Sequence, residues 1–332
     1  MFDPTKHCYP MHQVVSATVD RAEEAGKLAP RGLRFPYPEL RGYCANLLPG
    51  RIAQVLAQTS NFKSGFIRYW EKDAIAQLQE QKRNEAVVHV TTEDYVEEII
   101  ANWIAAEAGL GTPEFEVGEV KDWQAVRIAA GKLASKPFFL IGASLKYAED
   151  IPTLHMSNIL KCLEAIAKGD ITGIQVQIGS IFYDYLQAFA YDPEIAKIKG
   201  ADQRRLQVRE DMFRIRKSAA YFNASIVFAC QAKQTLDGAP SKEFYTPGMY
   251  DGKEASEIAE HSDRIFSLWM PARTHGVNNT YSHKMHTYTA WDNSLWLRVV
   301  KQRGKLPAGR VFPFRINFAE DSLARDELYW TD

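Results

Sequence analysis

Residues 51–66 read RIAQVLAQTSNFKSGF, and the fold class can be inferred outward from this stretch. An apolar segment over 51–57 follows a Pro-Gly turn and leads into a polar loop, after which a helical pattern runs over 64–81. Short apolar segments and amphipathic stretches keep alternating along the chain. This alternation predicts an α/β fold with a mostly parallel central sheet flanked by helices. The other expected strands cover 85–91, 136–141, part of 172–183, 225–230, 264–270 and 295–301, and the other expected helices cover 94–108, 157–168 and 204–222.

Composition and charge exclude several classes of protein. The 332-residue chain is 46% hydrophobic and carries 40 basic and 41 acidic side chains, a balance that excludes nucleic-acid binding through bulk positive charge. The cysteines form no CxxC pair, which argues against a zinc ribbon or a disulfide framework and favours reduced thiols in a cytoplasmic protein. The polar, proline-broken N-terminus is unlike a secretory signal. Apolar runs fall far short of the roughly 20 residues that span a membrane.

In parallel sheets, ligands bind beyond the carboxyl ends of the strands, so the residues after each expected strand are the candidates. A phosphate-binding loop needs backbone N–H groups at a helix N-terminus, a Lys for the phosphates and a Ser or Thr for Mg²⁺. Lys63 and Ser64 stand at those places, whereas Phe62 replaces a Gly of the GxxxxGK[ST] pattern. A surface Lys-Ser pair is the alternative. The candidate loop comprises Thr59, Ser60, Asn61, Phe62, Lys63 and Ser64.

Three later strands also end in polar residues. Glu93 follows a strand taken to lie next to the phosphate strand, where a carboxylate can polarise the water that attacks a γ-phosphate. An acid that only stabilises a helix N-terminus is the alternative. Asp184 ends an apolar strand and either serves a Mg²⁺ site or caps a turn. Gln231 ends the next strand and either senses a γ-phosphate or makes an edge hydrogen bond.

Two cations, Lys301 and Arg303, follow the apolar segment that ends the last expected strand. They suit stabilisation of phosphate charge, within one chain or as an arginine finger from a neighbouring subunit, and a solvated basic turn is the alternative. The signals are modest one by one. Their order on one alternating chain favours a nucleotide-hydrolysing site.

The ordered motifs resemble those of the RecA-like ATPase domain of the DnaB-type replicative helicases. Residues 184–187, DYLQ, reproduce a stretch of that family letter for letter, at the end of its Walker B strand. The resemblance implies a RecA-like P-loop ATPase core over 31–318, with an N-terminal arm or linker helix over 1–30 and a C-terminal tail over 319–332. The family's N-terminal domain is not matched, as expected of a single-domain phage- or plasmid-type version. Further matching stretches are 32–40, 48–50, 57–64, 87–94, 226–231, 249–263 and 301–311.

The resemblance assigns roles around one ATP molecule. Lys63 would hold the phosphates, and Ser64 and Asp184 would bind Mg²⁺. Glu93 would activate the attacking water. Gln231 would couple the γ-phosphate to a loop that faces DNA.

The resemblance also implies partners. Lys301 and Arg303 would reach the nucleotide of a neighbouring subunit, which requires a ring, expected to be a hexamer, or a filament. Lys233 and Lys253 would contact single-stranded DNA, with Lys253 replacing a family Arg. The implied function is an ATP-dependent helicase or translocase in replication or recombination.

Phe62 leaves a second function open. A bulky side chain stands where backbone normally approaches phosphate, which favours a weakly or non-hydrolysing ATP-binding assembly protein such as a loader, mediator or scaffold. A nucleotide-free interaction domain is a third possibility.

Three histidines, His275, His283 and His286, lie close together in the sequence. Two of them have the spacing of metal ligands, but no matching Cys or acid cluster follows, so a loop or hairpin insertion is expected. Tyr281 and Tyr288 in the same stretch either stack on bases or pack in the protein.

Overall fold

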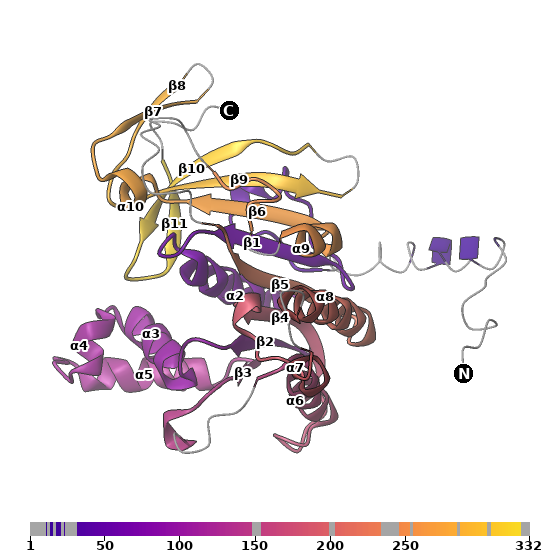
Figure 1. The fold of residues 1–332 in the computed structure, drawn as a ribbon. Coiled ribbons are helices and arrows are strands. Elements are labelled where there is room, and N and C mark those ends of the chain that lie inside the picture. The colour runs from indigo at the N-terminus through magenta and orange to yellow at the C-terminus, as the bar shows by residue number, and fades with distance from the viewer. Residues whose placement is uncertain are drawn as a thin grey trace.

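A mixed sheet forms the centre of the protein (Figure 1). The computed structural model describes residues 32–147, 154–198, 203–233, 246–252, 255–283, 286–303 and 307–326, together with a few helical residues between 11 and 23. Within these residues the sheet has nine strands in the order β11-β10-β9-β6-β1-β5-β4-β2-β3. The strands are β1 (Ile52–Ala57), β2 (Glu85–Thr91), β3 (Phe138–Ile141), β4 (Gln177–Asp184), β5 (Ser225–Gln231), β6 (Arg264–Trp269), β9 (Ser294–Gln302), β10 (Val311–Asn317) and β11 (Ser322–Arg325).

Strands β6, β1, β5, β4, β2 and β3 run parallel, and β9, β10 and β11 extend the sheet with antiparallel pairs. Every residue of β1 is buried, as expected of a central strand that is covered on both faces. Ala57 at the end of β1 pairs in register with Gln231 at the end of β5, and Thr91 pairs with Asp184. The loops after β1, β2, β4 and β5 therefore open at one edge of the sheet.

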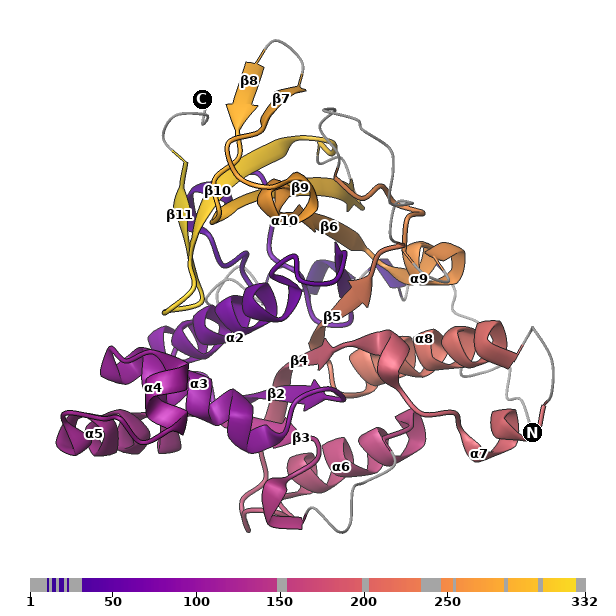
Figure 2. The ribbon, with the colours of Figure 1, turned by 60° about the vertical axis from the view of Figure 1, so that its left-hand side comes forward.

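Helices cover both faces of the sheet (Figure 2). On one face, α2 packs Phe66 and Trp70 against Phe35 and Phe266, and burial of each such ring is worth about 1.5–3 kcal/mol. On the other face, α6 and α8 cover a second apolar cluster. No helix within the described ranges is long and apolar enough to cross a membrane. The helices are α2 (Lys63–Glu80), α3 (Val96–Ala108), α4 (Thr112–Glu116), α5 (Trp123–Ala134), α6 (Met156–Lys168), α7 (Pro193–Ala196), α8 (Gln203–Tyr221), α9 (Ala255–His261) and α10 (Pro271–His275).

A separate hairpin, β7 (Thr280–His283) and β8 (His286–Thr289), projects near β9 in both views. Tyr281 and Tyr288 of this hairpin pack edge-on against Trp296, with ring centroids 5.5 and 5.1 Å away. Both tyrosines are buried, so they pack in the protein rather than offering their faces to bases. The side chains of the three histidines lie outside the described part of the structure.

The predicted α/β fold with a mostly parallel sheet is confirmed. Two features differ from the prediction. The strand that precedes Glu93 is not next to the phosphate strand, because β5 and β4 lie between β1 and β2. The alternation of strands and helices predicts that successive strands run parallel. It does not predict which place each strand takes in the sheet. In addition, Ser322–Arg325, assigned to a tail, pairs with β10 as β11, so the sheet extends beyond residue 318.

Candidate functional site

The loop between β1 and α2 has the backbone of a tight turn. Ser60 (φ 62°) and Phe62 (φ 60°) both adopt the left-handed conformation, for which glycine is the usual residue. The helix begins at Lys63, and its preceding residue makes no side-chain cap. The N–H groups of its first turn and the positive end of the helix dipole therefore point toward the loop, an arrangement that binds anions such as phosphate.

Phe62 retains the backbone that the missing glycine would supply. Its ring lies over the first turn of α2, where a Cβ added at Gly65 would overlap the ring carbon Cε2. The ring also meets Phe318 edge-on, with centroids 6.0 Å apart. The bulky side chain is thus accommodated by a glycine three residues later and packs against the residue that follows β10.

Asn61 fixes the loop to the sheet. Its side chain is 3% exposed, its Oδ1 accepts a hydrogen bond of 2.7 Å from the backbone N–H of Met270, and its Nδ2 donates to the carbonyl of Thr59 at 2.9 Å. Because Met270 follows β6, the loop is held against the strand next to β1. This role of Asn61 was not predicted from the sequence.

The structure brings Lys63, Asp184 and Glu93 together around Tyr185. The ammonium group of Lys63 lies 4.0 Å from the centroid of the Tyr185 ring, and Tyr185 hydrogen-bonds to Glu93. Burial raises the pKa of Glu93; Asp184 and Asp94 add to that rise, whereas Lys63 and the Tyr185 hydrogen bond oppose it. A carboxylate with a raised pKa is better matched to proton transfer near neutral pH.

Thr92 joins the ends of β2 and β4. Its backbone N–H donates to the carbonyl of Asp184 at 3.1 Å, and its hydroxyl lies 3.4 Å from the carbonyls of Asp184 and Tyr185. These hydrogen bonds hold Thr92, and with it the adjacent Glu93, beside Asp184. Glu93 therefore reaches the site even though two strands separate β2 from β1.

Asp184 and Ser64 fit a magnesium site. Asp184 is 6% exposed, and its Oδ1 is buried without a hydrogen-bond partner among the described residues. A buried carboxylate oxygen with no partner is uncommon and suits a hard cation, which prefers oxygen ligands and retains several waters. Ser64 lies in the first turn of α2. No group of three or more His, Cys, Asp or Glu side chains in the described residues forms a metal cluster, so further ligands would come from water and phosphate.

Gln231 contacts the loop from the end of β5. Its Nε2 donates to the hydroxyl of Thr59 at 2.5 Å, and its backbone N–H donates to Gln187 Oε1 at 3.1 Å. Gln187 in turn donates to the carbonyl of Gln231 at 3.3 Å. Gln187, the last residue of the DYLQ stretch, thus holds Gln231 in place. The sequence analysis singled out this stretch but did not predict the contact.

Lys301 and Arg303 lie at the opposite edge of the sheet from Lys63. Strand β9 runs antiparallel to β6, so the residues at its end pair with Arg264 at the start of β6. Arg303 pairs with Asp263 at 3.3 Å, and Lys301 donates to the carbonyl of Ala259 at 2.7 Å. Neither cation therefore joins the site of its own chain.

Of the two lysines assigned to DNA, the structure describes one. Lys233 is exposed just after β5, its backbone N–H donates to the carbonyl of Asp251 at 2.7 Å, and its carbonyl accepts from Gln58 at 3.2 Å. Lys253 lies outside the described residues. Lys233 is thereby tied to Gln58, the residue that follows β1 and leads into the phosphate loop.

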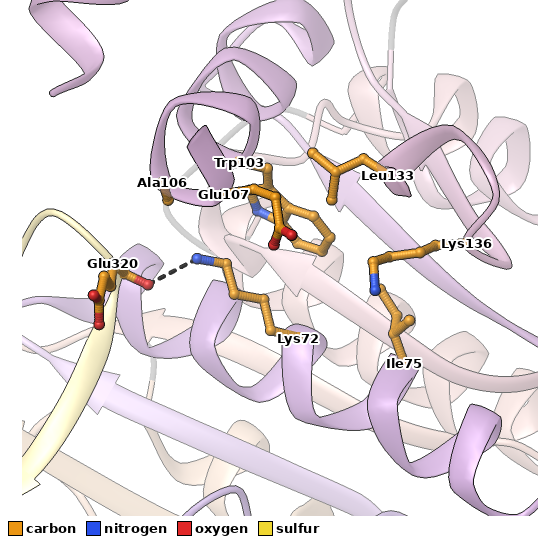
Figure 3. A pocket seen from close by; sticks show the side chains of 8 residues that line it. All are labelled: Lys72, Ile75, Trp103, Ala106, Glu107, Leu133, Lys136 and Glu320. Atoms are coloured by element: carbon orange, nitrogen blue, oxygen red, sulfur yellow. Dashed lines mark hydrogen bonds between the residues drawn. The ribbon is translucent and has the colours of Figure 1, made fainter. Parts of the chain in front are cut away.

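A cavity of about 370 Å³ lies beside α2, away from these residues (Figure 3). Lys72 lines it and donates a hydrogen bond from Nζ to the carbonyl of Glu320 at 2.8 Å. Trp103 on α3 stacks on Phe138 at 4.6 Å. None of the residues predicted for the site lines this cavity, whose walls are Lys72, Ile75, Trp103, Ala106, Glu107, Leu133, Lys136 and Glu320.

Two solved structures share this architecture over nearly the whole chain. One, described as an ATPase domain, matches with a TM-score of 0.73 and 14% identity, over 96% of this chain and 100% of its own. This chain has the RecA-like DnaB ATPase fold. A DnaB-like replicative helicase, described with its interactions with primase, matches with a TM-score of 0.69 and 13% identity, over 95% of this chain and 67% of its own. Searches of protein-family models and of curated proteins find no match for the sequence.

Proposed function

We propose that the protein is an ATP-hydrolysing motor of the helicase or translocase type that acts on single-stranded DNA in replication or recombination. The observation that carries the proposal is the convergence of Lys63, Glu93 and Asp184 at the loop that begins α2. The fold shared with a solved ATPase domain and with a DnaB-like replicative helicase supports the same interpretation.

The residues divide the work of phosphoryl transfer. The N–H groups of the loop and the ammonium of Lys63 hold the β- and γ-phosphates of ATP. The carboxylate of Glu93 accepts a proton from the water that attacks the γ-phosphate, for which its raised pKa suits it. Ser64 and Asp184 would hold Mg²⁺, which would neutralise charge on the phosphate oxygens. Gln231 senses the γ-phosphate through its contact with Thr59.

Lys301 and Arg303 lie away from the site of their own chain. We therefore propose that Arg303 and Lys301, which lie at the far edge of the sheet, act on the nucleotide of an adjacent subunit. This requires self-assembly as a ring, expected to be a hexamer, or as a filament. Stabilisation of the spreading phosphate charge by an arginine in trans is worth about 10³ to 10⁵ in rate.

The DNA contact is proposed at the exposed end of β5. Lys233 follows Gln231 by two residues, so a movement of Gln231 toward a γ-phosphate reaches the Lys233 backbone directly. Lys253 is the second lysine that we propose contacts DNA. Binding through such lysines is electrostatic and tolerant of sequence.

The Glu93→Gln variant tests the proposal. The amide keeps the shape of the side chain but accepts no proton, so nucleotide binding is expected to stay within about twofold while hydrolysis falls at least about a hundredfold. Lys63→Ala is the matched control and is expected to lose nucleotide binding itself. Unchanged turnover in Glu93→Gln removes Glu93 from its role.

Phe62 favours a second candidate, an ATP-binding assembly protein that hydrolyses weakly or not at all. A phenylalanine in the left-handed region of the phosphate loop is an unusual choice for rapid turnover. Strand separation on a forked duplex distinguishes the two functions, because an assembly protein binds DNA and ATP without unwinding.

A further inference from the structure

A buried pair of polar side chains joins α2 to β2 behind the candidate site. His89 on β2 and Glu71 on α2 are 2% and 0% exposed, and His89 Nδ1 lies 2.5 Å from Glu71 Oε1. Burial of a pair like this is costly unless each polar atom is satisfied. The roles proposed above use neither residue.

Three polar atoms around this pair are buried with no hydrogen-bond partner among the described residues. They are His89 Nε2, Glu71 Oε2 and Asp184 Oδ1. Other buried polar atoms of the described residues also lack a partner, but these three lie in one cluster, which indicates a bridging group that joins them.

The sheet register places His89 and Asp184 on the same face. His89 pairs with Phe182, and Thr91 pairs with Asp184, so His89 and Asp184 are diagonal neighbours on adjacent strands. Val87 and Phe182 belong to the cluster under α2, whereas Val88 and Tyr183 belong to the cluster on the other face. Side chains alternate along a strand, and therefore His89 and Asp184 both point toward α2. His89 Nε2 and Asp184 Oδ1 make no direct hydrogen bond to each other, and diagonal neighbours are within reach of one bridging water.

Several charged side chains surround the imidazole of His89. Arg68 of α2 pairs with Asp321 at 2.6 Å, so its charge is already shared. The carboxyl groups of Glu71 and Asp184 both interact with His89. Asp94 is a third carboxyl group close enough to interact with Asp184 and His89. Burial lowers the pKa of His89, but Glu71 and Asp184 outweigh burial, and the net shift is upward.

We infer that His89 is a positioning residue for Asp184: its Nε2 holds Asp184 Oδ1 through one buried water, while Glu71 fixes the imidazole ring through Nδ1. The inference rests on the proposed function, because it concerns the carboxylate that would bind Mg²⁺. A water molecule both donates and accepts, so it can join Nε2 to Oδ1 in either protonation state of the ring. Partners of this kind fix the orientation of a metal ligand, and their loss typically weakens metal binding 10- to 100-fold.

Two substitutions of His89 separate positioning from structure. In His89→Asn the amide nitrogen replaces Nδ1 and keeps the contact with Glu71, but nothing replaces Nε2. In His89→Gln the amide nitrogen takes the place of Nε2. The readout is the Mg²⁺ concentration that gives half of the thermal stabilisation by a non-hydrolysable ATP analogue, with the half-saturating Mg²⁺ for hydrolysis measured alongside.

His89→Asn is expected to raise the Mg²⁺ requirement about tenfold, and His89→Gln to stay within about twofold of the native protein, although both lower the melting temperature. Equal Mg²⁺ requirements in the two variants overturn the inference. If His89→Asn does not fold, Glu71→Ala, which frees the ring, is expected to show the same rise, and Glu71→Gln, which keeps an acceptor for the ring, is not.

The experiment separates this inference from the proposed function. A native protein that shows no Mg²⁺-dependent stabilisation by the analogue overturns both. A native protein that responds, with variants that match it, overturns the role of His89 alone.

Discussion

The ammonium group of Lys63 lies 4.0 Å from the centroid of the Tyr185 ring, whose hydroxyl hydrogen-bonds to Glu93. One tyrosine thus contacts both the cation that would hold the phosphates and the carboxylate that would activate water. A cation over an aromatic face is held by about 0.5–2 kcal/mol, so Lys63 is ordered before nucleotide arrives and can leave the ring at small cost.

Tyr185→Phe separates these two contacts, because it keeps the ring and removes the hydroxyl. The hydrogen bond from Tyr185 lowers the pKa of Glu93, so its loss raises that pKa further. Glu93 must be ionised to accept a proton, and the acid limb of the pH–rate profile is therefore expected to move to higher pH, with a several-fold loss of hydrolysis on that limb. Nucleotide affinity at pH 8 serves as the control and is expected to stay unchanged. An acid limb at the native position means that Tyr185 does not act on Glu93.

Gly65→Ala tests the accommodation of Phe62 in the phosphate loop. Helix propensity alone favours Ala over Gly by about 1 kcal/mol, but the new Cβ would overlap the Phe62 ring. We expect a net loss of stability of about 1–3 kcal/mol in denaturant unfolding, together with weaker nucleotide binding. The double variant Phe62→Gly with Gly65→Ala is expected to recover most of both losses, since the clash is gone. Additive effects of the two changes would show that the ring does not depend on Gly65.

Arg303→Ala tests catalysis across a subunit interface. We expect hydrolysis to fall about 10³-fold with nucleotide binding retained. Arg51→Ala is a matched control, because Arg51 also pairs with Asp263, at 3.1 Å, and has no proposed role in catalysis. Mixing Arg303→Ala with Glu93→Gln is expected to restore part of the activity, because some interfaces then combine an intact Arg303 with an intact Glu93. A mixture as inactive as its components argues against the trans arrangement.

Asp211 on α8 predicts how stability depends on pH. Burial raises the pKa of Asp211 to about 7, against an ordinary value near 4 in the unfolded chain. The folded state therefore binds the proton more tightly, and this residue makes stability fall as pH rises from about 4 to about 7. Asp211→Asn removes the titration, keeps an acceptor for Gln207 and is expected to stabilise the protein by about 1–3 kcal/mol at pH 8 and little at pH 4. Urea unfolding at the two pH values measures this, and an equal effect at both contradicts it.

The sequence predicted which polar residues meet where the parallel strands end. Lys63, Asp184 and Gln231 come together because the carboxyl ends of parallel strands share one edge, a rule that needs no knowledge of strand order. Glu93 shows where that rule stops: its strand lies three places from β1, and only the contacts of Thr92 and Tyr185 explain how it reaches the loop. Such contacts between strands depend on the place that each strand takes in the sheet after its connecting helix. Local sequence does not encode that place.

Residues outside strand ends were harder to predict. Phe62 departs from the motif, and nothing in the linear pattern shows that Gly65 makes room for its ring. The pair formed by Glu71 and His89 is equally hidden, since the two residues are 18 positions apart and belong to different elements. These contacts can be predicted only when the packing of side chains between separate helices and strands is known.

The most direct test of the central claim is a structure determined with Mg²⁺ and a non-hydrolysable ATP analogue. We expect the γ-phosphate within hydrogen-bonding distance of Lys63 Nζ, the metal at Ser64 and Asp184, and Glu93 one water molecule away from the γ-phosphate. A nucleotide bound elsewhere, with these side chains uninvolved, would contradict the assignment of the site and of the motor function built on it.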